Sequence, residues 1–269
     1  MRVGIEARLD YWIEEPAEVL LLIEAAALPD QQLHRQSLWV SSDVPLTAHR
    51  GTDGVGQRTW ALGRGRFVAD YHAEVEIVRS SPPAASLPAT PLRDLPDEAV
   101  PYLLPSRYCE AAEFEGFVHD TFPGLEGGAL ATALAAWVRD NLRYRSNASS
   151  GTTTALDTFA RRRGVCRDYA HLLVALARAG GIPARCVSAY APGVDPPDFH
   201  AVAELWLAGG WRLFDATGMG DENSLVRVAV GRDATDIAFM TIFGEAQLLS
   251  QSVRVWEVGD GNAEGNISL

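Results

Sequence analysis

A cysteine at the start of an apolar helix is the residue of this sequence best suited to covalent chemistry. Cys166 follows Gly164 and a run of charged residues, and the helix predicted after it ends at Ala179, before the stop signal Gly180-Gly181-Ile182-Pro183. Unpaired backbone N–H groups and the helix dipole favour negative charge at a helix start, so a thiol there ionises more easily than a free thiol. Cys166 is therefore predicted to act as a thiolate nucleophile.

A thiolate nucleophile requires a base within hydrogen-bond reach. His171 is the nearest histidine in the sequence, but it lies about 140° around the helix axis from Cys166 and faces away from it. The base must come from another part of the chain, and His200 is favoured by elimination. The other histidines lie in the N-terminal part of the chain or in a short acidic loop region: His34, His49, His72 and His119.

Asp215 is the predicted partner of His200, because a carboxylate commonly orients the imidazole of such a base. His200 begins a strand that runs to Leu207, and Asp215 ends the next strand, so both lie at the same end of a predicted hairpin. A two-residue turn at Gly209-Gly210 would place Asp215 opposite Glu204, roughly 13 Å from His200. A bulge, a strong strand twist or a shifted turn must close this gap, and the sequence leaves these alternatives open.

Three predicted helices, followed by strands, would position these residues. Apolar residues at helical spacing from Leu130 to Leu142 predict the first helix, a second is capped by Thr152–Thr154 and ends near Arg163, and the third begins at Cys166. The strands are predicted at Cys186–Tyr190, from His200 to Leu207 and at Trp211–Asp215. Helices followed by antiparallel strands indicate an α+β fold.

The N-terminal part of the chain shows the patterns of β structure. Val19–Ala27 is a mainly apolar run, and apolar residues alternate with polar ones from Tyr71 to Ile77. A small antiparallel β sandwich is therefore predicted for residues 1–100. Seven of the fifteen prolines lie between Ser81 and Pro105 and predict an extended linker at the end of this domain. Residues 101–269 form the second predicted domain, the catalytic one, with a C-terminal β extension.

Composition excludes several classes of function. The formal net charge of −12 gives no electrostatic footprint for nucleic acid or an anionic membrane, and the basic cluster Arg161–Arg163 is interpreted as helix capping. No apolar stretch reaches the ~20 residues that cross a bilayer, and no signal peptide pattern is seen, so a cytoplasmic location is expected. Three cysteines without close spacing argue against a disulfide framework and a four-ligand zinc site.

Four blocks of sequence resemble the transglutaminase-like cysteine enzymes. In chain order they are Gly164-Val165-Cys166-Arg167-Asp168, Gly181-Ile182-Pro183-Ala184-Arg185, His200-Ala201-Val202-Ala203-Glu204 and Trp211-Arg212-Leu213-Phe214-Asp215-Ala216-Thr217. The resemblance implies a papain-like core with Cys166 as nucleophile, His200 as general base and acid, and Asp215 orienting the imidazole. It also implies that the fold tolerates the short spacing between His200 and Asp215.

The resemblance extends in a weaker form over most of the chain. A β domain ahead of Tyr102-Leu103-Leu104-Pro105-Ser106-Arg107-Tyr108 looks like that of bacterial transglutaminase-like proteins classed with the cysteine proteases. Residues 226–255 also resemble the tail of that bacterial group, for which no chemical role is inferred.

The implied reaction begins with attack of the Cys166 thiolate on an amide or ester carbonyl, which forms an acyl-thioester. Water would then complete a protease or amidase reaction, whereas a second amine would complete a transglutaminase reaction; hydrolysis is favoured. The oxyanion would be held by the backbone N–H of Cys166 and by a side chain, for which Tyr108 is a speculative candidate. The expected partner is a protein or peptide substrate, and no cofactor or metal is expected.

Two rival interpretations come from other classes of function. The same fold also serves as a non-catalytic interaction module when its active residues are lost, but Cys166, His200 and Asp215 are all present. A metal site built from Cys166, Cys186 and His200 lacks any known ligand spacing. Cys109 and Cys186 are interpreted as small apolar residues. The oligomeric state and the natural substrate are left open by the sequence.

Overall fold

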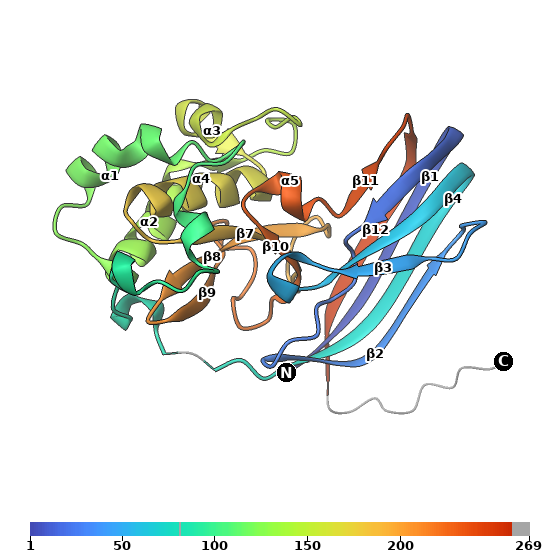
Figure 1. The fold of residues 1–269 in the computed structure, drawn as a ribbon, viewed down its shortest axis with the longest axis horizontal. Coiled ribbons are helices and arrows are strands. Elements are labelled where there is room, and N and C mark those ends of the chain that lie inside the picture. Colours follow the sequence, from blue (N-terminus) through green and yellow to red (C-terminus); the bar gives the residue numbers. More distant parts are fainter. Residues whose placement is uncertain (81, 260–269) are drawn as a thin grey trace.

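The computed structural model describes residues 1–80 and 82–259, and it places a sheet of long strands beside a part that contains both helices and strands (Figure 1). The first sheet has six strands in the order β11-β1-β4-β2, with β12 also paired to β1 and β3 also paired to β4. Its strands are β1 (Arg2–Leu21), β2 (Gln31–Val40), β3 (Thr47–Arg50), β4 (Gln57–Ile77), β11 (Met240–Ile242) and β12 (Gln247–Val258). The β structure predicted for the N-terminal part is confirmed.

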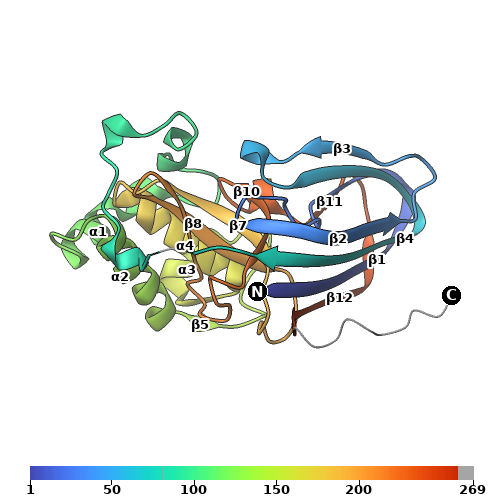
Figure 2. The ribbon, with the colours of Figure 1, turned by 90° about the horizontal axis from the view of Figure 1, so that it is seen from below.

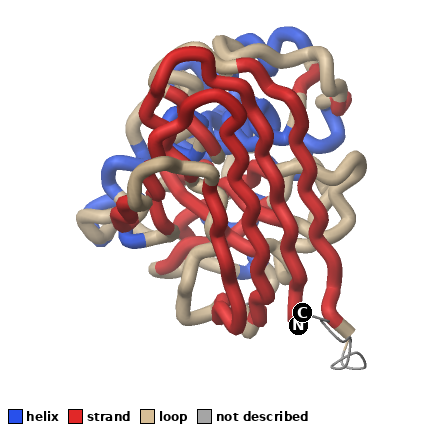
Figure 3. The backbone as a smooth tube through the Cα atoms, turned by 90° about the vertical axis from the view of Figure 1, so that its right-hand side faces the viewer, coloured by secondary structure: helices blue, strands red, loops and turns tan. Residues whose placement is uncertain are grey.

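Strands β1 and β4 are the two long central strands of this sheet. They pair antiparallel from Arg2 opposite Glu76 to Leu21 opposite Thr59, with a register shift between Ile13 and Ala17. The residues of β1 alternate between the core and the exposed face, as expected for a sheet with one covered side. Figure 3 shows the long strands lying side by side. Two strands of this sheet, the short β11 and the longer β12, come from the far end of the chain.

The second part contains a four-stranded antiparallel sheet in the order β10-β7-β8-β9. These strands are β7 (Ala184–Tyr190), β8 (His200–Leu207), β9 (Gly210–Phe214) and β10 (Val226–Gly231). The helices are α1 (Glu115–Thr121), α2 (Gly127–Asn141), α3 (Ala155–Arg161), α4 (Cys166–Ala179) and α5 (Ala234–Ile237). Figure 2 shows α1 to α4 grouped away from the six-stranded sheet. The predicted α+β architecture is confirmed.

Short elements complete the chain between these parts. Strands β5 (Arg143–Tyr144) and β6 (Arg163–Gly164) form a parallel pair, which joins the end of α2 to the end of α3. Single 3₁₀ turns occur at η1 (Thr52–Gly54), η2 (Ala84–Ser86), η3 (Leu92–Asp94), η4 (Val100–Leu103) and η5 (Ala111–Phe114). Within the described part of the chain, no helix is both long and apolar enough to span a membrane.

Helix α4 lies at the centre of the second part. Every residue from Asp168 to Arg178 is buried, because the helix packs on β7 and β8 and is covered by α2, α3 and η5. The helix predicted from Cys166 to Ala179 is confirmed at both ends. Its first residue is thereby held at the edge of the sheet.

The hairpin between β8 and β9 differs from the prediction. Leu207 pairs with Gly210, so the turn consists of Ala208 and Gly209 and not of Gly209 and Gly210. Both turn residues have positive φ, 51° and 76°, which is the geometry of a type I′ hairpin turn. The Ala208 N–H donates to the carbonyl of Pro88 at 3.1 Å, and this tertiary contact holds an alanine in a conformation that the sequence would assign to glycine.

The shifted turn reduces the predicted gap between His200 and Asp215 along the strand from four residues to two. The observed register pairs Ala203 with Phe214, and the next step along both strands sets Asp215 beside Val202, two residues from His200. Of the three alternatives that the sequence leaves open, the structure therefore shows the shifted turn.

A buried ion-pair network connects the second sheet to the N-terminal part. Glu204 of β8 is fully buried, and its carboxylate lies 2.6 Å from Arg185 and 3.0 Å from Arg227. Arg185 also pairs with Asp53 at 2.8 Å, and Arg227 also pairs with Asp30. Glu204 is thus the buried carboxylate that the two guanidinium groups share, and each has a second carboxylate partner.

Replacing Glu204 by alanine is expected to lower the free energy of unfolding by about 3–5 kcal/mol, because it leaves two buried arginines without their shared partner. The control is Glu6→Ala, which removes an exposed ion pair with Arg254 and should change the same quantity by less than about 1 kcal/mol. Both are measured by urea unfolding at neutral pH. Equal effects of the two substitutions would show that the buried network does not stabilise the fold.

Candidate active site

The turn before α4 presents Cys166 at the first position of the helix. Asp168 is buried, its Oδ2 accepts a hydrogen bond from the Val165 N–H at 2.8 Å, and its Oδ1 accepts one from Ser149 Oγ at 2.8 Å. A Cβ at Gly164 would lie 2.6 Å from the Cβ of Asp168, so glycine is required for this close approach. Asp168 therefore caps the N-terminus of α4.

His200 and Asp215 are hydrogen-bonded to each other in the interior. Nε2 of His200 lies 2.9 Å from Oδ2 of Asp215, and the two side chains are almost completely buried. Asp215 also accepts hydrogen bonds from the N–H and hydroxyl of Thr217 at 2.8 and 2.6 Å and from the Gly220 N–H at 2.8 Å. Burial opposes ionisation of Asp215, but the hydrogen bonds from His200, Thr217 and Gly220 hold its pKa below the usual value.

The surroundings of His200 favour its protonated form. Burial lowers its pKa, but the hydrogen bond to Asp215 and the neighbouring Cys166 outweigh burial and raise the pKa to about 9. Nε2 is engaged by Asp215, whereas Nδ1 is buried without a hydrogen-bond partner in the described part of the chain, so Nδ1 is the ring nitrogen available to Cys166. An imidazolium therefore lies between a carboxylate and a thiol near neutral pH.

A tyrosine that sequence reasoning missed also contacts Cys166. Tyr144 of β5 pairs with Gly164 of β6, two residues before Cys166, and its hydroxyl is close enough to Cys166 for the two to influence each other's ionisation. Burial and the neighbouring Cys166 raise the pKa of Tyr144 to about 12, so the hydroxyl keeps its proton. A two-residue parallel pairing leaves no periodic signal in the sequence, which is why this contact could not be predicted.

Tyr108 lies in the same region but is engaged differently. Its hydroxyl donates to the carbonyl of Gly151 at 2.7 Å, and its ring stacks on His171 with centroids 5.2 Å apart. The hydroxyl proton is thus directed to Gly151.

A cleft of about 610 Å³ opens over Cys166 and His200. Phe199 and Phe239 stack on each other in its wall, with ring centroids 4.3 Å apart, and Tyr108 forms another part of the wall. Further lining residues are the apolar Ala201, Ile237 and Ala238 and the charged Arg107, Arg167 and Asp198. Cys166 and His200 therefore line a cleft whose walls are partly apolar and partly charged.

Comparison with known proteins identifies this arrangement. Residues 123–216, which contain Cys166, His200 and Asp215, match the sequence model of the transglutaminase-like superfamily. A crystal structure of a protein from Cytophaga hutchinsonii, provisionally named a cysteine protease, is 32% identical, covers 95% of this chain and 90% of that chain, and superposes with a TM-score of 0.88. This chain belongs to the transglutaminase-like superfamily.

Curated relatives of this transglutaminase-like protein match over a shorter stretch. An uncharacterized protein of Mycobacterium leprae is 34% identical over 114 residues, which is 39% of this chain and 41% of that protein. An uncharacterized protein of Mycobacterium tuberculosis is 29% identical over 119 residues, or 39% of this chain and 38% of that protein. The match thus spans about two fifths of the length of these mycobacterial relatives.

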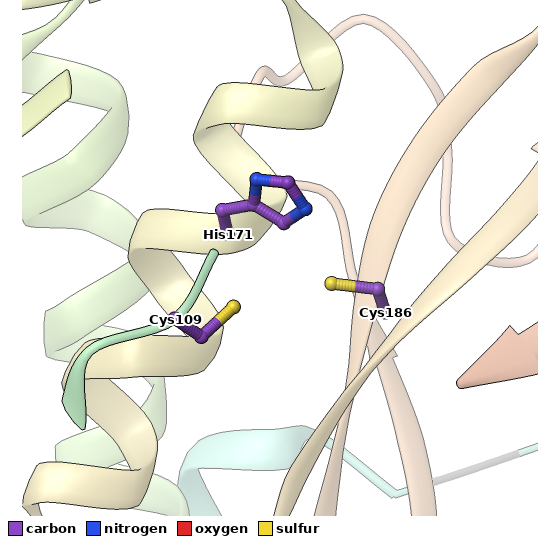
Figure 4. Close-up of side chains that lie close together, drawn as sticks. All are labelled: Cys109, His171 and Cys186. Atoms are coloured by element: carbon purple, nitrogen blue, oxygen red, sulfur yellow. The ribbon is translucent and has the colours of Figure 1, made fainter. Parts of the chain in front are cut away.

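A second cluster of sulfur and nitrogen atoms lies away from the cleft of this transglutaminase-like fold. Side-chain atoms of Cys109, His171 and Cys186 lie within 4.8 Å of one another, and Figure 4 shows the two thiols below the imidazole. Nε2 of His171 accepts a hydrogen bond from the Ala234 N–H at 3.0 Å. Hydrogen bonding to Cys109 and burial raise the pKa of Cys186 well above its usual value. Metal binding would require deprotonated thiols and a free imidazole lone pair, so these groups fit a neutral, packed core better.

The cluster also bears on the rival metal site. The rival metal site requires Cys186 to lie beside Cys166 and His200. In the structure Cys186 is instead grouped with Cys109 and His171. Cys109 and Cys186 are both buried, as predicted for small apolar residues.

His171 predicts a specific acid sensitivity. Burial lowers its pKa to about 3, whereas the unfolded chain binds the proton near pH 6.5. The unfolded state therefore gains stability relative to the folded state as the pH falls from 6.5 towards 3, by at most about 1.4 kcal/mol per pH unit.

Replacing His171 by glutamine, which retains a hydrogen-bond acceptor for Ala234, should remove this contribution. Above pH 7 the difference in unfolding free energy between the wild type and His171→Gln is expected to be constant. At lower pH the wild type is expected to lose stability relative to His171→Gln. Urea unfolding of both proteins from pH 8 to pH 4 measures it. Parallel pH profiles would contradict the burial of a neutral imidazole.

Proposed function

We propose that this protein catalyses thiol-dependent acyl transfer on amide bonds and that its reaction is that of a cysteine protease or amidase. The proposal is carried by one observation, the placement of His200 between the carboxylate of Asp215 and the thiol of Cys166. A cationic imidazole beside a thiol stabilises the thiolate, which is the nucleophilic form. Membership of the superfamily and the likeness to the Cytophaga hutchinsonii protein support the same reaction class.

The proposed first step forms the acyl-thioester. The Cys166 thiolate attacks the carbonyl carbon of the substrate, a C–S bond forms, and the carbonyl oxygen takes up the negative charge. The backbone N–H of Cys166 and the hydroxyl of the neighbouring Tyr144 would donate hydrogen bonds to this oxygen. Nδ1 of His200 then gives its proton to the departing amine as the C–N bond breaks, and Asp215 keeps the ring oriented.

The second step returns the enzyme to its starting form. His200, now neutral, removes a proton from water while the oxygen attacks the thioester carbonyl. The C–S bond breaks, a carboxylic acid leaves, and the imidazolium and thiolate are restored. We assign the oxyanion role to Tyr144 and not to Tyr108, because the Tyr108 hydroxyl is directed to Gly151.

Amine transfer remains a second outcome of the same chemistry, because an amine can replace water in the second step. The relative provisionally named a cysteine protease favours hydrolysis. The chain contains no lysine, so it offers no lysine side chain for cross-linking to itself. Transfer to an added amine can therefore be measured without self-cross-linking through lysine.

A protein or peptide is the proposed substrate class. The cleft of about 610 Å³ has apolar walls and charged residues, a combination suited to side chains on either side of an amide bond. The non-catalytic alternative is disfavoured, because Cys166 and His200 line this cleft together and Asp215 supports His200. The cytoplasmic location stays a prediction.

The activated thiol can be tested without knowledge of the substrate. Iodoacetamide alkylation of the folded protein, followed by peptide mass spectrometry, should label Cys166 rapidly well below pH 8, because the thiolate is stabilised by His200. The buried Cys109 and Cys186 are internal controls and should stay unlabelled. In His200→Ala the labelling of Cys166 should slow markedly at pH 6–7. Equal labelling of Cys166 in both proteins would refute the Cys–His pair and favour a non-catalytic module.

The oxyanion role of Tyr144 predicts a kinetic effect. Tyr144→Phe removes the hydroxyl and keeps the ring, so kcat on a peptide amide substrate is expected to fall roughly 10²-fold or more with KM nearly unchanged. Tyr108→Phe is the matched control and should retain most of kcat. Cys166→Ala sets the background, with no activity expected. A fall in kcat for Tyr108→Phe but not for Tyr144→Phe would reverse the assignment.

A further inference from the structure

A cavity of about 810 Å³ lies apart from the catalytic cleft and is lined by arginines. It is formed by residues from the end of α2, from the strand pair β5–β6 and from the end of α3. Figure 1 labels α2 and α3. The arginines that line it are Arg143, Arg145, Arg161, Arg162 and Arg163. Five cations thus surround one hollow in a chain whose formal net charge is −12.

Most of this positive charge is not neutralised by the protein. Arg161 pairs with Asp157 at 2.9 Å, but the other four arginines have no carboxylate within 4.0 Å among residues 1–80 and 82–259. Asp140 is the single carboxylate among the lining residues, and it lies 3.2 Å from Arg139. Guanidinium groups gathered in this way repel one another, and a bound anion would relieve the repulsion.

Arg162 is half-buried and held in place by its neighbours, whereas the side chains of the other four arginines are exposed. It ends α3 with a φ of 54°, and its guanidinium stacks over the rings of Trp137 and Phe159, 4.5 and 4.2 Å from their centroids. Its Nη1 is buried without a hydrogen-bond partner in the described part of the chain. The helix-capping interpretation of Arg161–Arg163 accounts for the position of Arg162 at the end of α3 but not for its unused N–H groups.

The backbone fixes two further arginines on a rigid frame. The Arg143 N–H donates to the carbonyl of Arg162 at 3.0 Å, and the Arg145 N–H donates to the carbonyl of Gly164 at 2.9 Å. Successive side chains of a strand point to opposite sides. Tyr144 therefore faces Cys166 while its two neighbours face the cavity.

We propose that this cavity is a binding site for an anion that carries two or more adjacent phosphate or carboxylate groups. Arginine is the side chain best suited to such groups, because its planar guanidinium donates two parallel hydrogen bonds to one of them. The volume lies within the range of small-ligand sites. The ligand is either a small polyphosphate or an acidic peptide segment, and the site does not depend on the reaction proposed for Cys166.

Isothermal titration calorimetry of the full chain distinguishes a polyphosphate ligand from an acidic peptide ligand. The probes are inorganic tripolyphosphate and a hexaglutamate peptide, each at 50 and 200 mM salt. At least one probe is expected to bind with one site per chain and to weaken at the higher salt concentration. Binding of tripolyphosphate alone would identify a phosphate ligand, and binding of the peptide alone would identify a carboxylate ligand.

The double variant Arg143→Gln/Arg163→Gln should bind the probe with an at least tenfold higher Kd than the wild type. Arg93→Gln, an exposed arginine outside the cavity, is the matched control and should bind as the wild type does. Arg145→Gln serves as a second cavity variant in case the double variant does not fold, which circular dichroism reports. The proposal is wrong if neither probe binds, or if a probe binds equally well to the wild type and to a folded cavity variant.

Discussion

Burial of helix α4 on all sides is the constraint on which the candidate active site depends. The helix lies on β7 and β8 and beneath α2 and α3, so its axis cannot tilt or slide without opening the core. Its N-terminus is held by the carboxylate of Asp168, which accepts the Val165 N–H. The thiol of Cys166 is thereby held near the beginning of β8, where His200 lies. A reactive residue on a mobile loop could not be placed so closely against its partner.

The electrostatics of the site follow from this packing. Asp215 sits behind His200 and is saturated with donors from the histidine, Thr217 and Gly220, so it stays ionised although it is buried. The imidazole between it and Cys166 is consequently held as a cation. The second buried histidine, His171, lies beside neutral thiols and accepts a backbone N–H, and it stays neutral. His200 is therefore a cation and His171 is neutral, because only His200 is hydrogen-bonded to a carboxylate.

Local signals in the sequence were sufficient for much of this outcome. The glycine before Cys166, the apolar run after it and the Gly-Gly-Ile-Pro stop predict helix α4 to the residue, and the family motifs point to His200 and Asp215. The spacing of the last two could not be predicted. The turn register depends on the contact between Ala208 and Pro88, a residue far away in the chain. Tyr144 was missed for a similar reason, since its neighbour in β6 is a tertiary and not a local partner.

The pairing of β1 with strands from the far end of the chain constrains how the molecule can be assembled during synthesis. β1 leaves the ribosome before its partners β11 and β12, which lie far along the chain from it. Until they arrive, one edge of β1 presents unpaired backbone groups. Phe239 and Thr241, which line the cleft, arrive at the same late moment. A nascent chain thus contains Cys166, His200 and Asp215 before it contains Phe239 and Thr241, so the wall of the cleft is completed only after these three residues have been made.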